Sequence, residues 1–134
     1  MPYSTKADRN DTARMFLILG VMGALATIVA IAGELLFRNE SLTTIGKAVS
    51  LISIGLLVPG RDKDEYLKGL WHAGANMGLI FVIFWTMIAP LATGFYDGFT
   101  GAPREFEFPY EAVFIVLSAG FFAGFNWHRF RGAP

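Results

Sequence analysis

The longest uncharged stretch of the chain runs from Gly69 to Phe95, twenty-seven residues without Asp, Glu, Lys or Arg. A helix needs about twenty apolar residues to cross the hydrocarbon core of a bilayer, so this stretch is long enough to span a membrane with some tilt. The composition supports the same interpretation, because 54% of the residues are hydrophobic and 16% are charged, whereas soluble domains carry about 25% charged residues. The sequence therefore predicts an integral membrane protein.

Apolar segments on both sides of this stretch predict three further spans. The second of the four is the weakest, because Lys47 interrupts its apolar run, and Pro90 predicts a kink in the third. The four predicted helices cover approximately residues 12–37, 42–59, 69–95 and 110–128. We therefore expect an all-α protein, a four-helix transmembrane bundle in which residues 1–134 form a single domain.

The basic residues are distributed unequally between the two sides of such a bundle. Eight of the eleven belong to the N-terminal tail, the connection at 61–68 and the C-terminal tail: Lys6, Arg9, Arg14, Arg61, Lys63, Lys68, Arg129 and Arg131. The other side carries only Arg38, Lys47 and Arg104. By the positive-inside rule both termini are expected in the cytoplasm, in a multi-pass protein of the cell (inner) membrane.

Several functional classes lack support in the composition. Cysteine is absent, which excludes disulfides, thiolate metal sites and thiol catalysis. Eleven basic and eleven acidic residues cancel, so no net charge points to a nucleic-acid partner. The sequence contains no nucleophile–base set, phosphate-binding glycine loop or zinc-helix motif. We therefore expect a protein that is not an enzyme and has no metal site.

Two matched sets of glycine and tryptophan predict how the last two helices pack. The sets are Trp71, Gly74 and Gly78 in the third helix and Gly120, Gly124 and Trp127 in the fourth. Counted from each tryptophan, the glycines lie about 4.5 and 10.5 Å along both helices. Membrane helices associate closely through small residues, so the sets predict a tight antiparallel hairpin near the cytoplasmic leaflet, with both tryptophans at the interface. The alternative is that glycine is simply frequent in membrane helices.

Glu34 and Lys47 are the ionisable residues inside the predicted spans. Glu34 lies about a turn, and Lys47 about a turn and a half, from the outer end of its helix, so the sequence predicts an intramembrane ion pair between the first and second helices. Charges inside a membrane are costly and also indicate function. The alternatives are a cation, proton or substrate site, or side chains that extend to the lipid headgroups.

His72 and His128 each follow a tryptophan at the cytoplasmic boundary. Two histidines on neighbouring helices suit the ligation of haem or of a chlorin magnesium. The alternative is an interfacial belt of amphipathic rings, which the Trp-His pairs also fit. The sequence favours the belt, so we expect no cofactor, and we expect lipid contacts rather than contacts with a pigment, haem or quinone.

These features favour a small accessory or structural subunit of a larger membrane protein complex. Its expected partners are membrane lipids and other membrane subunits, in a hetero- or homo-oligomer. One alternative is a small oligomeric transporter or channel that uses Glu34 and Lys47. A second alternative is a holin-like membrane protein, which the size and the basic C-terminal tail also allow.

Overall fold

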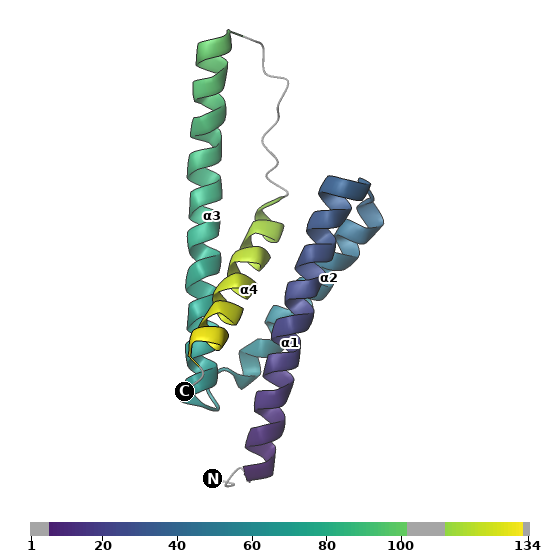
Figure 1. Ribbon diagram of the computed structural model, residues 1–134, viewed down its shortest axis with the longest axis vertical. Coiled ribbons are helices and arrows are strands. Elements are labelled where there is room, and N and C mark those ends of the chain that lie inside the picture. The colour runs from purple at the N-terminus through teal and green to yellow at the C-terminus, as the bar shows by residue number, and fades with distance from the viewer. Residues whose placement is uncertain (1–5, 102–111, 133–134) are drawn as a thin grey trace.

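The computed structural model describes residues 6–101 and 112–132, and these residues contain four α-helices and no strand. The helices are α1 (Lys6–Ala32), α2 (Glu40–Leu57), α3 (Glu65–Thr100) and α4 (Val113–Arg131) (Figure 1). A π-helical turn, Gly33–Phe37, extends α1, and a 3₁₀ turn, Val58–Gly60, extends α2. The all-helical prediction is confirmed for this part of the chain. The predicted beginning of the fourth helix, Tyr110, lies outside the described residues.

Three of the described helices are long and apolar enough to cross a membrane. They correspond to Asn10–Phe37, Glu40–Gly60 and Glu65–Thr100. The remaining helix, α4, has 19 described residues, and its last turn contains His128, Arg129 and Arg131. These residues lower the mean hydropathy of α4, because any 18-residue window in this helix includes at least His128 and Arg129.

The four helices alternate in direction (Figure 1). The beginning of α1, the end of α4 and the connection between α2 and α3 lie at one end of the molecule, which we call the lower end. Helix α3 packs on α4, α1 packs on α2, and α4 also packs on α1. Helix α4 therefore joins the two hairpins, while α3 extends far above the other three helices.

The turn between α1 and α2 is defined by the residues that end one helix and begin the next. Arg38 adopts a left-handed conformation, with φ of 46°, and Asn39 caps α2 by accepting hydrogen bonds from the backbone N–H groups of Ser41 and Leu42. An asparagine side chain satisfies amide groups that have no partner inside the helix. This short turn makes α1 and α2 antiparallel neighbours.

Helix α3 is longer at both ends than the sequence predicts. It has 36 residues, which corresponds to about 54 Å at 1.5 Å per residue. Asp64 caps its beginning by accepting from Tyr66 N, and Gly101, with φ of 62°, ends it with a hydrogen bond from Gly101 N to Asp97 O. The prediction that the helix ends at residue 95 is therefore wrong, and α3 also continues through Pro90 without a break (Figure 1).

The hydrophobic core lies in the lower half of the molecule. Seven buried side chains from all four helices form it: Phe16, Leu57, Leu67, Leu70, Phe121, Phe122 and Phe125. Phe16 of α1 contacts Phe125 of α4 with ring centroids 5.8 Å apart. Because this core is confined to the lower half, the upper part of α3 lies outside it.

Candidate functional site

The glycines singled out in the sequence lie at the contact between α3 and α4. A methyl group on Gly120 would lie 2.9 Å from Gly78 Cα, and one on Gly124 would lie 2.5 Å from Ala73 O. On the other helix, a methyl group on Gly74 would lie 3.0 Å from the carbonyl oxygen of Phe121. The two backbones leave no room for a methyl group at Gly120 or Gly124 and little at Gly74, so the structure brings the two glycine sets together.

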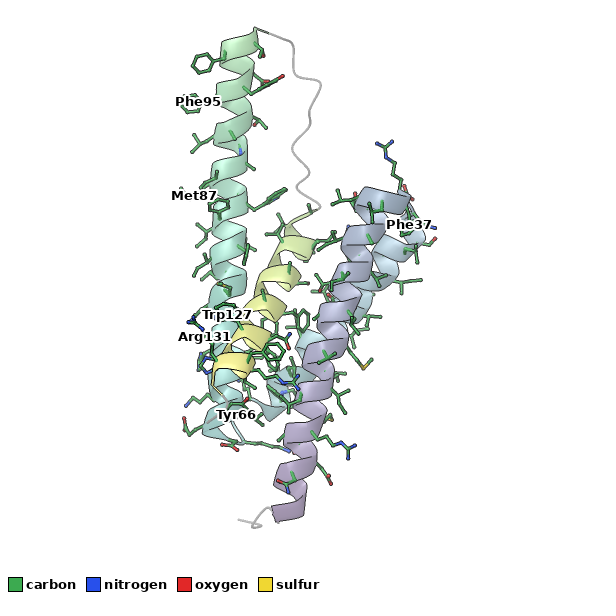
Figure 2. The ribbon with its side chains drawn as sticks, viewed as in Figure 1. Phe37, Tyr66, Met87, Phe95, Trp127 and Arg131 are labelled. Atoms are coloured by element: carbon green, nitrogen blue, oxygen red, sulfur yellow. The ribbon has the colours of Figure 1, made fainter. Side chains whose placement is uncertain are left out.

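The two tryptophans of these sets occupy different environments. Trp71 is half-buried and packs edge-on against Phe121, with ring centroids 5.2 Å apart. Trp127 is 60% exposed, and the Arg131 guanidinium lies 4.7 Å from its ring centroid (Figure 2). Trp127 follows the fully buried Phe125 by two residues, about 200° around the helix. The tryptophans are therefore not equivalent, although they are symmetric in the sequence.

Glu34 and Lys47 do not form the predicted ion pair. Both side chains belong to the described part of the chain, and no ion pair joins them. A methyl group on Gly33 would lie 2.9 Å from Thr43 N, so the neighbouring Glu34 is level with the beginning of α2. Lys47 is four residues farther along α2, about 6 Å deeper. The two residues therefore lie at different depths, because Gly33 packs against Thr43 and Lys47 lies a full turn beyond it.

His72 and His128 are both exposed near the lower end of the molecule. The Nε2 atom of His128 would lie 3.4 Å from a methyl group on Gly69, which places this histidine beside the beginning of α3. The described part of the chain contains no group of three or more His, Asp or Glu side chains arranged to hold a metal ion. Ligation of a haem or chlorin by the two histidines stays a prediction.

The upper part of α3 forms a surface that the sequence analysis did not identify. We call residues 87–100 the α3 extension. Its large apolar side chains are exposed, from 44% for Ile88 to 87% for Phe99. Met87 and Phe95 point away from α4 (Figure 2). In the most apolar window of α3 only 6% of the residues are buried, against 28% in the windows of the other two long helices, so α3 is by far the least covered.

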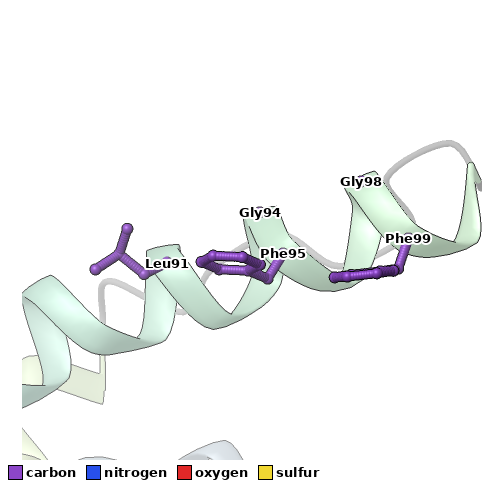
Figure 3. Close-up of a pocket in the computed structure, with 5 residues that line it drawn as sticks. All are labelled: Leu91, Gly94, Phe95, Gly98 and Phe99. Atoms are coloured by element: carbon purple, nitrogen blue, oxygen red, sulfur yellow. The ribbon is translucent and has the colours of Figure 1, made fainter.

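A shallow groove of about 360 Å³ lies on the α3 extension (Figure 3). Its lining residues are Leu91, Gly94, Phe95, Gly98 and Phe99. A methyl group on Gly94 or Gly98 would meet no atom within 4 Å. Gly94 follows Gly74 by twenty residues, about 200° around the helix. The groove therefore faces away from the side of α3 that contacts α4.

The sequence does contain a signal for this groove. Gly94 and Gly98 have the four-residue spacing that allows membrane helices to approach closely. The sequence predicts that the helix ends at residue 95. Gly98 then lies outside the helix, so the Gly94–Gly98 spacing does not predict a helix surface. Comparison with protein-family models, with curated proteins and with solved structures finds no match.

Proposed function

We propose that this chain is a small, non-catalytic integral membrane protein that packs as an accessory or structural subunit against a larger membrane protein complex. The observation that carries the proposal is the α3 extension, a long apolar helix surface that no other described helix covers. Lipid covers apolar side chains well, but the open Gly94–Gly98 groove also allows the backbone of another helix to approach.

The length of α3 supports a protein neighbour over lipid alone. A helix of about 54 Å exceeds the roughly 40–45 Å thickness of a bilayer with its headgroups. Unless α3 is strongly tilted, apolar residues at its upper end, such as the 87% exposed Phe99, reach beyond the hydrocarbon core. Another membrane subunit covers such residues both inside and outside the lipid.

The proposed topology has four membrane spans, of which α4 is the fourth. The protein lies in the inner membrane of the cell, and both of its termini are in the cytoplasm. The lower end of the molecule gathers the beginning of α1, the α2–α3 connection and the end of α4 (Figure 1). These are the segments that carry most of the basic residues, for example Arg14, Lys63 and Arg129. This distribution supports a cytoplasmic lower end by the positive-inside rule.

Affinity purification from the native membrane tests the proposal. The tagged wild-type chain is expected to purify with other membrane subunits in fixed stoichiometry. Gly94→Leu combined with Gly98→Leu fills the groove and should remove these subunits from the complex. Gly55→Leu is the matched control, because a methyl group on this α2 residue also meets nothing within 4 Å. It should leave the complex intact.

Other results assign the chain to one of the alternative classes. A wild-type chain that purifies alone, or with unchanged partners after the groove is filled, contradicts the proposal. Cation flux into liposomes that depends on Glu34 and Lys47 would indicate a transporter or channel instead. Membrane lysis on expression would indicate a holin-like protein.

A further inference from the structure

A second groove, of about 390 Å³, lies between α1 and α4 near the lower end of the molecule. Its floor and walls are apolar side chains of α1, and an arginine from each helix lines it. The lining residues are Arg14, Leu17, Ile18, Val21, Met22 and Arg129. The α1 residues recur at intervals of three and four, so they form one continuous stripe along the helix surface. Two cations thus border an otherwise hydrophobic groove.

No described carboxylate forms an ion pair with either of these two arginines. The single ion pair among the described residues joins Arg61 to Asp62 and does not involve Arg14 or Arg129. Two other arginines at the same end are engaged by aromatic rings, since Arg61 lies 6.0 Å from the ring centroid of Trp71 and Arg131 lies 4.7 Å from that of Trp127. Arg14 and Arg129 therefore offer guanidinium groups for an anion that comes from outside the chain.

The apolar groove continues upward along α1. A further groove of about 320 Å³ shares Met22 with the first and runs between α1 and α2 past Leu25, Val29 and Ile45. From Arg14 to Val29 the path covers fifteen residues, about 22 Å. Half of the hydrocarbon core of a bilayer is about 15 Å thick. An acyl chain that enters beside the arginines can thus remain in contact with α1 through its own leaflet.

We propose that this groove binds an anionic phospholipid, with its phosphate between Arg14 and Arg129 and an acyl chain along α1. Guanidinium groups bind phosphate oxygens with charge-assisted, often bidentate hydrogen bonds. Basic sites between membrane helices on the cytoplasmic side suit anionic headgroups, and the adjoining apolar groove requires a ligand that is anionic at one end and hydrocarbon at the other. This lipid site rests on the proposed membrane topology and is independent of the α3 extension.

Native mass spectrometry of the full-length protein in an uncharged detergent tests the headgroup contact. The probes are phosphatidylglycerol and phosphatidylcholine, added at equal concentration. The wild type should retain phosphatidylglycerol preferentially. R14Q/R129Q should bind it about 30-fold more weakly, the factor that two arginines contribute at an anionic lipid surface. The control K68Q/R131Q removes two exposed charges from the same end of the molecule and should change the affinity by less than about threefold.

A pair of methionine variants tests the acyl-chain contact. Met15 and Met22 are each 50% exposed on α1, but only Met22 lines both grooves. Met22→Trp fills the junction of the grooves and should reduce lipid retention several-fold with both arginines present. Met15→Trp should leave it unchanged, and equal helicity by circular dichroism shows that both variants fold.

Three results would overturn the lipid site. Equal retention of the two phospholipids by the wild type means that the headgroup is not recognised. Equal losses in R14Q/R129Q and K68Q/R131Q indicate a diffuse attraction to positive charge. Displacement of bound phosphatidylglycerol by millimolar inorganic phosphate indicates a simple anion site, whereas retention of the lipid shows that the acyl chain contributes to binding.

Discussion

The lower and upper halves of α3 contain glycines at the same spacing but in opposite environments. Gly74 and Gly78 lie in tight contact with α4, where a methyl group would be 3.0 and 3.2 Å from its nearest neighbours, whereas Gly94 and Gly98 face open space. The same residue type therefore forms an internal contact in one half and leaves a groove in the other. In the lower half glycine allows α3 and α4 to pack closely, and in the upper half it leaves an open surface.

The largest expected effect comes from filling the internal contact. A side chain at Gly124 begins 2.5 Å from Ala73 O and must push the α3 and α4 backbones apart. Gly124→Leu should therefore lower the free energy of unfolding by about 3 kcal/mol or more, at the upper end of overpacking effects. Gly98→Leu in the α3 extension should not destabilise the isolated chain, because glycine is a poor helix former. Unfolding in mixed micelles measures both, and similar losses would contradict the comparison.

The next effect concerns the contact between α1 and α2. A methyl group on Gly46 would lie 2.7 Å from both Ala26 O and Ala30 N, so Gly46→Ala should destabilise the chain by about 2 kcal/mol. Gly55→Ala, in the same helix but in open space, should stabilise it by about 0.5–1 kcal/mol. The sign of the change in the free energy of unfolding decides the test. If both variants are less stable than the wild type, the loss at Gly46 cannot be assigned to its contact with α1.

Hydroxyl groups also differ between the two halves. Thr27 Oγ1 and Ser50 Oγ lie 3.0 Å apart across the buried α1–α2 contact, whereas Thr93 Oγ1 in the α3 extension donates to the Pro90 carbonyl of its own helix. A double-mutant cycle of Thr27→Val and Ser50→Ala should give a coupling energy near 0.6 kcal/mol, the average for interhelical hydrogen bonds in a membrane. Thr93→Val should change the free energy of unfolding less than either single variant. A coupling energy of zero would mean that this hydrogen bond does not stabilise the α1–α2 contact.

The smallest effect is expected at the exposed tryptophan. The Arg131 guanidinium lies 4.7 Å from the ring centroid of Trp127 on the outside of α4. Exposed cation–π contacts contribute about 0.5–1 kcal/mol, so Arg131→Gln should lower the free energy of unfolding by no more than about 0.5 kcal/mol. Thermal unfolding in detergent checks this value. A loss several times larger would mean that Arg131 contributes to the packing between helices.

The sequence predicts the parts of this fold that depend on local composition. Long uncharged segments predict the helices, and Gly74, Gly78, Gly120 and Gly124 are recognisable because a repeated spacing on two helices does not depend on how the rest of the chain folds. Features that depend on helix continuation are harder to predict. Residues 96–100 contain Asp97 and Gly98, which are poor helix formers, so they resemble a loop, although they continue α3 until Gly101.

Relative depth is a second property that local composition does not determine. The sequence predicts similar depths for Glu34 and Lys47, but the contact of Gly33 with Thr43 places Glu34 nearer the turn. Similarly, nothing in the sequence indicates that α3 rises above the other helices, because that depends on where four separate helices begin and end. The groove on the α3 extension could be identified only after these boundaries were known.

Photo-crosslinking in the native membrane tests the central claim that the α3 extension contacts another subunit. Phe95 and Ile28 have similar exposures, 68% and 61%, and a photoreactive residue replaces one of them at a time. We expect a protein adduct of defined mass at position 95 and only lipid adducts at position 28 of α1. Lipid adducts alone at position 95, or the same protein adducts at both positions, would contradict it.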